Sequence, residues 1–113
     1  KSLCRKRKAD HGVDGVATIG MCLTGNFAIS LMADDAVLAS VASQPSLPIG
    51  DQGALHMSPD EVQRVRDRLE VEGPMKALRF EGDPLCTAEK FSAIDKAFNT
   101  DRERVTSSWV LPG

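Results

Sequence analysis

The sequence predicts an α/β domain in which about four parallel strands and three helices form a three-layer αβα arrangement. Two observations lead to this fold class. Short apolar runs bounded by turn residues alternate with longer segments in which apolar residues recur at helical spacing. The resulting order, a strand and a helix repeated three times and closed by a fourth strand, is typical of a parallel sheet with helices on both faces.

The predicted strands occupy residues 16–19, 36–41, 75–80 and 105–111. The first two are short, apolar and bounded, as expected for buried strands. After the second strand, Pro45 and Pro48 prevent regular pairing. We therefore expect a turn there, followed by a loop over residues 50–57.

The predicted helices occupy residues 23–32, 58–72 and 88–98. The second begins with a capping box, in which the Ser58 side chain caps the helix and Glu61 returns the hydrogen bond. Gly73 and Pro74 end it. Thr87 is expected to cap the third helix.

Four consecutive basic residues at positions 5–8 are typical of the last turn of a helix, where cations complement the helix dipole. Residues 1–10 are therefore expected to be the end of a helix that starts upstream. The alternative interpretation is a localisation or nucleic-acid-binding signal.

The composition is that of an ordinary globular domain, with 42% hydrophobic and 27% charged residues and a net charge of −2. This balance gives no long-range attraction to nucleic acid or to an anionic membrane. No apolar run approaches the ~20 residues of a membrane-spanning helix. Cys4, Cys22 and Cys86 form no C-x-x-C pair, which argues against a disulfide framework and favours the cytoplasm. His11 and His56 have no partner at ligand spacing, so no metal is expected.

The segment Gly20-Met-Cys22-Leu-Thr24-Gly25 has the layout of a nucleophile elbow, a strand-to-helix turn that presents a reactive side chain. Small residues are needed around the strained nucleophile, and Gly20 and Gly25 meet that need. Thr24 is bulkier than the usual glycine. The helix that follows would favour thiolate over thiol at Cys22.

This segment has three other interpretations. A phosphate-binding P-loop needs Lys and Ser or Thr where this chain has Asn26 and Phe27. A dinucleotide fingerprint needs glycine where Cys22 stands. A buried structural cysteine in an ordinary turn stays open, because free cysteine is among the most buried residue types.

Asp83 follows the third predicted strand, so it is expected at the same sheet edge as Cys22. That order, nucleophile and then acid, is the order of a nucleophile–acid–histidine relay. The alternative is that Gly82-Asp83-Pro84 is only a turn. His11 and His56 both precede Asp83 in the chain and are poor candidates for the third member, so the triad is incomplete without a further histidine.

The chain resembles the dienelactone hydrolase family of α/β-hydrolases in three segments: GMCLTGNFA at the elbow, VASQPSLP, and LRFEGDPLCTAEKF around the acid. The resemblance runs from about residue 11 to residue 113 and corresponds to the C-terminal half of a family member. It implies a partial α/β-hydrolase fold over residues 1–113. It also implies hydrolysis of esters or lactones by a Cys–His–Asp triad; the type reaction opens a dienelactone during aromatic-ring degradation.

Residue by residue, the resemblance implies that Cys22 is the nucleophile, that Asp83 is the acid, and that the Leu23 backbone N–H donates to the oxyanion. The family's histidine follows a Pro-Gly pair, so Gly113 ends just short of it. Thr24 departs from the family's Gly-Gly pair. The implied reaction passes through a thioester and needs no cofactor.

Two alternatives of other classes remain. A non-catalytic half-domain would serve as an interaction or structural module and would self-associate through exposed apolar surface. A thiol redox protein would pair Cys22 with Cys86. Arg79 is interpreted as a solvated or ion-paired side chain, with binding of a substrate carboxylate as the alternative. Trp109 is interpreted as a core or interface residue.

Overall fold

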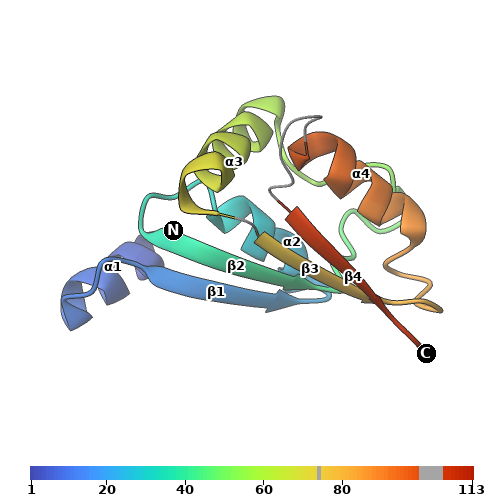
Figure 1. Ribbon diagram of the computed structural model, residues 1–113, viewed down its shortest axis with the longest axis horizontal. Coiled ribbons are helices and arrows are strands. Elements are labelled where there is room, and N and C mark those ends of the chain that lie inside the picture. The colour runs from blue at the N-terminus through green and yellow to red at the C-terminus, as the bar shows by residue number, and fades with distance from the viewer. Residues whose placement is uncertain (74, 100–105) are drawn as a thin grey trace.

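The computed structural model describes residues 1–73, 75–99 and 106–113 (Figure 1). The helices are α1 (Ser2–His11), α2 (Leu23–Leu31), α3 (Pro59–Glu72) and α4 (Ala88–Phe98). The strands are β1 (Val16–Met21), β2 (Val37–Ser43), β3 (Met75–Phe80) and β4 (Thr106–Leu111). The predicted α/β class with four parallel strands is confirmed, and the predicted bounds differ from the observed ones by at most two residues. Residue 105, predicted as the start of the last strand, lies outside the described residues.

The four strands are all parallel and lie in the order β1-β2-β3-β4. Neighbouring parallel strands are joined by right-handed crossovers. With strands in sequential order, such crossovers place every connecting helix on the same face of the sheet. Figure 1 shows α3 and α4 above the sheet, and α2 packs against β1 and β2 on that face.

The core lies between this sheet face and the three connecting helices. Its fully buried members include Ile29, Met32, Val37, Ala42, Val65, Leu69, Met75, Ala77, Ile94 and Phe98. Both sheet and helices contribute, as the apolar stripe of each amphipathic helix requires.

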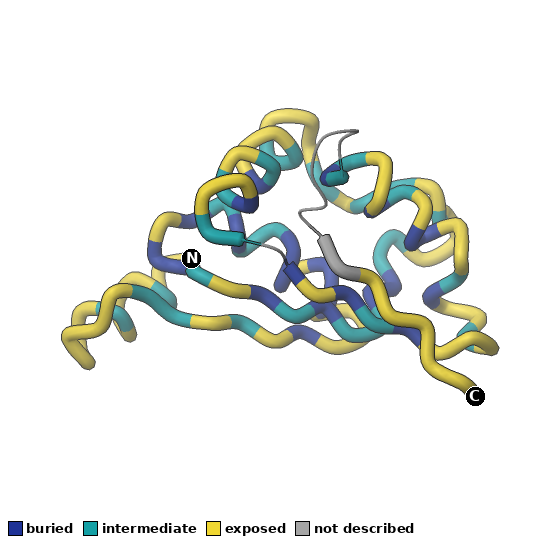
Figure 2. The backbone as a smooth tube through the Cα atoms, viewed as in Figure 1, coloured by how far each residue is buried: buried dark blue, intermediate teal, exposed yellow. Residues whose placement is uncertain are grey.

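The opposite sheet face, where a further helix layer was expected, carries exposed apolar residues of β1, β3 and β4. Figure 2 shows buried and more exposed positions alternating along the backbone of β1. Ile19 is 75% exposed and Met21 is 61% exposed. Trp109 is 52% exposed, and the Lys76 ammonium lies 5.1 Å from the centre of its ring. The interpretation of Trp109 as a core residue is therefore wrong within the described chain. Its location on an apolar face leaves the interface interpretation open.

The helix ends show which of the predicted capping residues form capping hydrogen bonds. In α3 the predicted capping box is confirmed: the Glu61 N–H donates to Ser58 Oγ, and the Ser58 N–H donates to Glu61 Oε2. Thr87 occupies the N-cap position of α4, but its side chain makes no capping hydrogen bond. α1 ends at Gly12, which has φ 61°. No helix in the described part of the chain is long and apolar enough to cross a membrane.

Candidate active site

Cys22 lies between β1 and α2 with φ 56° and ψ −122°, a conformation that residues other than glycine rarely adopt. Holding a side chain there costs on the order of 1–3 kcal/mol, so the surrounding contacts must enforce it. The residue is exposed and is the N-cap of α2. Leu23 is the first residue of that helix, where backbone N–H groups have no intrahelical partner. These features are those of the predicted elbow.

The two elbow glycines are required by close backbone contacts. A Cβ atom on Gly20 would overlap the carbonyl oxygen of Thr24. A Cβ atom on Gly25 would lie 2.9 Å from the Cα atom of Pro45. Gly20 therefore lets the chain reverse tightly around Cys22, and Gly25 lets the segment after β2 approach α2.

Thr24, which stands where a glycine is usual, hydrogen-bonds to the backbone of Met21, the last residue of β1. Its hydroxyl donates to the carbonyl oxygen of Met21 at 2.7 Å, and the Met21 N–H donates back at 2.9 Å. The Cys22 N–H points towards β2, where it bonds the Ser43 carbonyl. By strand alternation the Met21 groups point away from β2. Thr24 thus satisfies backbone groups that β2 does not pair.

Asp83 lies three residues beyond the end of β3, and its carboxylate accepts hydrogen bonds from three donors. Oδ1 accepts from the N–H groups of Leu85 at 2.8 Å and Cys86 at 3.3 Å. Oδ2 accepts from the side-chain amide of Gln44 at 3.1 Å. Asp83 is therefore a turn residue, as the alternative interpretation holds. Its second oxygen is also tied to the end of β2.

Cys22, Gln44 and Asp83 follow three neighbouring strands and lie at the carboxyl-terminal edge of the sheet. Strands lie about 4.8 Å apart, so positions after β1 and β3 are separated by roughly 10 Å across the sheet. That span accommodates an imidazole ring hydrogen-bonded to a sulfur on one side and to a carboxylate on the other.

Neither histidine of the sequence occupies that position. His11 is the last residue of α1, which precedes β1. His56 lies in the loop before α3 with its ring edge-on to Phe27, 6.5 Å between centroids. In the described part of the chain, the Asp83 carboxylate is hydrogen-bonded to Gln44, Leu85 and Cys86, and to neither histidine.

Ser46 is a site residue that the sequence reasoning missed. Its side chain is buried, 1% exposed, and its Oγ lies 3.6 Å from the Cys22 Sγ. Its backbone N–H donates to the Cys22 carbonyl at 3.3 Å. The only sequence signal was the Gln-Pro-Ser segment after β2, which indicated a turn without indicating what the turn approaches.

Lys90 is a second residue that the sequence did not indicate, and its side chain is fully buried. Its ammonium donates to the carbonyl oxygen of Leu47 at 2.7 Å and to that of Ala54. Burial lowers the pKa of Lys90 below its ordinary value. Asn26 of α2 joins the same carbonyl, donating to Leu47 O at 2.8 Å and accepting from Leu47 N at 2.8 Å. The loop after β2 is therefore fixed to both α2 and α4.

Cys86 and Arg79 lie on the helix-covered side of this edge. Burial and the nearby Asp83 carboxylate raise the pKa of the Cys86 thiol to about 12. Arg79 is buried, not solvated: its guanidinium donates to the carbonyls of Phe80 and Glu81 and lies 5.7 Å from the Phe91 ring centre. This position corrects the solvated interpretation, because Arg79 points to the face that α4 covers.

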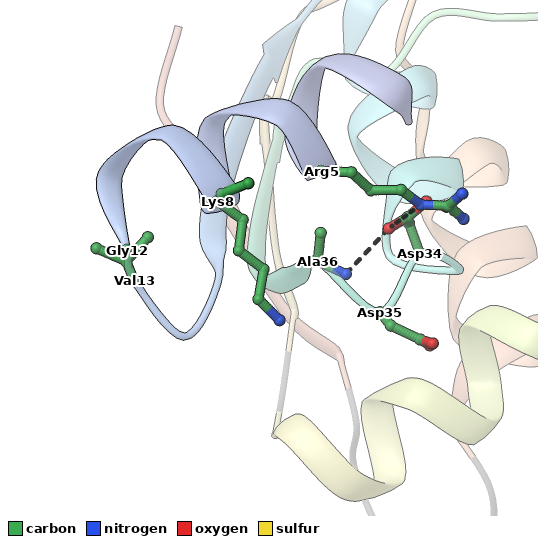
Figure 3. A pocket seen from close by; sticks show the side chains of 8 residues that line it. Arg5, Lys8, Gly12, Val13, Asp34, Asp35 and Ala36 are labelled. Atoms are coloured by element: carbon green, nitrogen blue, oxygen red, sulfur yellow. Dashed lines mark hydrogen bonds and ion pairs between the residues drawn. The ribbon is translucent and has the colours of Figure 1, made fainter.

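The described residues hold a surface pocket of about 450 Å³ away from Cys22, between α1 and the turn before β2 (Figure 3). Figure 3 shows Arg5 reaching across to Asp34, with 2.9 Å between Nη2 and Oδ2. Burial would raise the pKa of Asp34, but the Ala36 N–H and Arg5 together hold it below its ordinary value. The ion pair between Arg5 and Asp34 thus fixes α1 to the turn before β2.

Protein-family models, curated proteins and solved structures were each compared with the chain. None of them matches it. The relationship to dienelactone hydrolases therefore stays a prediction from the residues. Within the ranges that the structure describes, no group of three His, Cys, Asp or Glu side chains is placed to hold a metal ion.

Proposed function

We propose that the protein is a hydrolase of carboxylic ester or lactone bonds, similar to dienelactone hydrolases, in which Cys22 is the nucleophile. Asp83 is the acid of a Cys–His–Asp triad whose histidine lies outside these 113 residues. The observation that carries the proposal is the exposed Cys22 at φ 56° in a strand-to-helix turn. The proposed compartment is the cytoplasm, because Cys4, Cys22 and Cys86 are free thiols.

The proposed reaction has two halves. The Cys22 thiolate adds to the substrate carbonyl, and the Leu23 N–H helps to hold the oxyanion. The intermediate collapses as the carbon–oxygen bond to the leaving group breaks, and the histidine gives that oxygen a proton. A thioester remains. Water, deprotonated by the histidine, then releases the carboxylic acid and regenerates the thiol.

The first half-reaction provides a test on the chain itself, because an activated ester needs no acid to expel its leaving group. With p-nitrophenyl acetate we expect a burst of about one p-nitrophenolate per chain, followed by slow turnover. Cys22→Ala abolishes the burst, whereas the matched variant Cys4→Ala keeps it. A burst of the same size in Cys22→Ala would contradict the assignment of the nucleophile.

The second candidate is a non-catalytic interaction or structural module, and the exposed apolar sheet face favours it. Ile19 and Met21 of β1 and Trp109 of β4 all lie on that face, at its two outer strands. This candidate predicts self-association in sedimentation velocity and no burst. The redox alternative with Cys86 loses support, because a buried thiol with a pKa of about 12 is a poor partner for disulfide exchange at neutral pH.

A further inference from the structure

The Ser46 hydroxyl is buried, and the polar contact the structure gives it is with the reacting sulfur. Ser46 Oγ lies 3.6 Å from Cys22 Sγ, within hydrogen-bond range for sulfur. A buried hydroxyl requires a partner, since leaving it unpaired costs about 1–3 kcal/mol. Ser46 therefore interacts with Cys22 whichever form the sulfur takes.

The position of Ser46 is built by contacts from several elements. Pro45 packs on Gly25, and the Ser46 N–H bonds the Cys22 carbonyl. The backbone N–H and C=O of the next residue, Leu47, are hydrogen-bonded to the buried side chains of Asn26 and Lys90. A loop fixed from both sides at the adjacent residue holds the hydroxyl in one place.

The chemistry of sulfur decides the direction of this hydrogen bond. A thiol is a weak donor and a weak acceptor, so it gains little from the hydroxyl. A thiolate only accepts, and a hydrogen bond to a charged acceptor is roughly twice as strong as one between neutral groups. The Ser46 O–H donor therefore stabilises the thiolate more than the thiol.

We infer that Ser46 is a second group acting on the nucleophile, donating a hydrogen bond to the Cys22 thiolate and fixing its position for attack. The inference rests on the proposed role of Cys22. The thiolate of Cys22 is then stabilised both by the N-terminus of α2 and by a donor from the loop after β2. The stability of the thiolate therefore depends on the position of that loop.

The test is the rate at which iodoacetamide alkylates Cys22, followed by peptide mapping across a range of pH. At pH 7 we expect Ser46→Ala to lower this rate about five- to tenfold and to move the rise in rate to higher pH. Ser46→Thr, which keeps the hydroxyl, retains a rate within about twofold of the parent. Ser92→Ala, which removes a hydroxyl from an exposed position of α4, leaves the rate unchanged.

Alkylation of Cys4 in the same samples provides an internal reference, and thermal unfolding shows that each variant is folded. If Ser46→Ala does not fold, Ser46→Gly, which also lacks the hydroxyl, takes its place. A folded variant without the hydroxyl that alkylates as fast as the parent would overturn the inference. Alkylation does not involve an ester, so a missing burst with p-nitrophenyl acetate would count against the hydrolase and not against Ser46.

Discussion

Gly20→Ala is expected to lower the free energy of unfolding by about 3 kcal/mol, at the upper end of the cost of overpacking. The added methyl group would overlap the Thr24 carbonyl, which is backbone in the first turn of α2 and cannot move away freely. Relief requires the elbow to open, so Cys22 should also leave its strained conformation. Urea unfolding measures the first effect, and the rate of Cys22 alkylation measures the second.

Gly53→Ala is the matched control for this substitution. A Cβ atom on Gly53 would lie 3.2 Å from Glu89 Oε1, the end of a flexible side chain that can turn aside. We expect a change in stability within about 0.5 kcal/mol. Equal stability of the two variants would show that the elbow is not held by the contact at Gly20.

If the proposed triad is correct, Asp83→Asn is expected to lower kcat/KM for an ester substrate by about 10³–10⁴-fold in a chain that supplies the proposed histidine. In the proposed triad the carboxylate would orient the imidazole and stabilise its protonated form, and an amide would do neither. The contact with Gln44 should persist only if the amide turns its oxygen towards the Gln44 side chain. Steady-state kinetics measure the loss.

The control for Asp83→Asn is Asp35→Asn, an exposed carboxylate that follows α2 at the other edge of the sheet. We expect its activity to match that of the parent. Retention of activity within about tenfold in Asp83→Asn would remove Asp83 from the triad and leave it the turn residue that its bonds to Leu85 and Cys86 describe.

Local signals in the sequence were sufficient to predict the helices, the strands and the tight strand-to-helix turn at Cys22. The capping box at Ser58 acts within one helical turn. The small residues around Cys22 meet atoms only a few positions away, as with Gly20 and Thr24. Such short-range constraints leave a pattern in the sequence because the same few residues both create and satisfy them.

The contacts that complete the site act over long separations, and the sequence pattern does not show them. Lys90 and Leu47 are 43 positions apart, and Ser46 is 24 from Cys22. A lysine in an amphipathic helix is normally solvated, and Lys90 is buried because α4 packs against the loop after β2. The order of elements likewise did not show that β1 to β4 lie in sequence, which places the connecting helices on one face.

The most direct test of the central claim is to locate the acyl group. The chain is quenched with acid during its reaction with p-nitrophenyl acetate, digested and mapped by mass spectrometry. We predict a single acetyl thioester on Cys22, removed by hydroxylamine, with Cys4 and Cys86 unmodified. Acetyl groups spread over lysines and Cys4, with none enriched at Cys22, would contradict the account of Cys22 as a catalytic nucleophile.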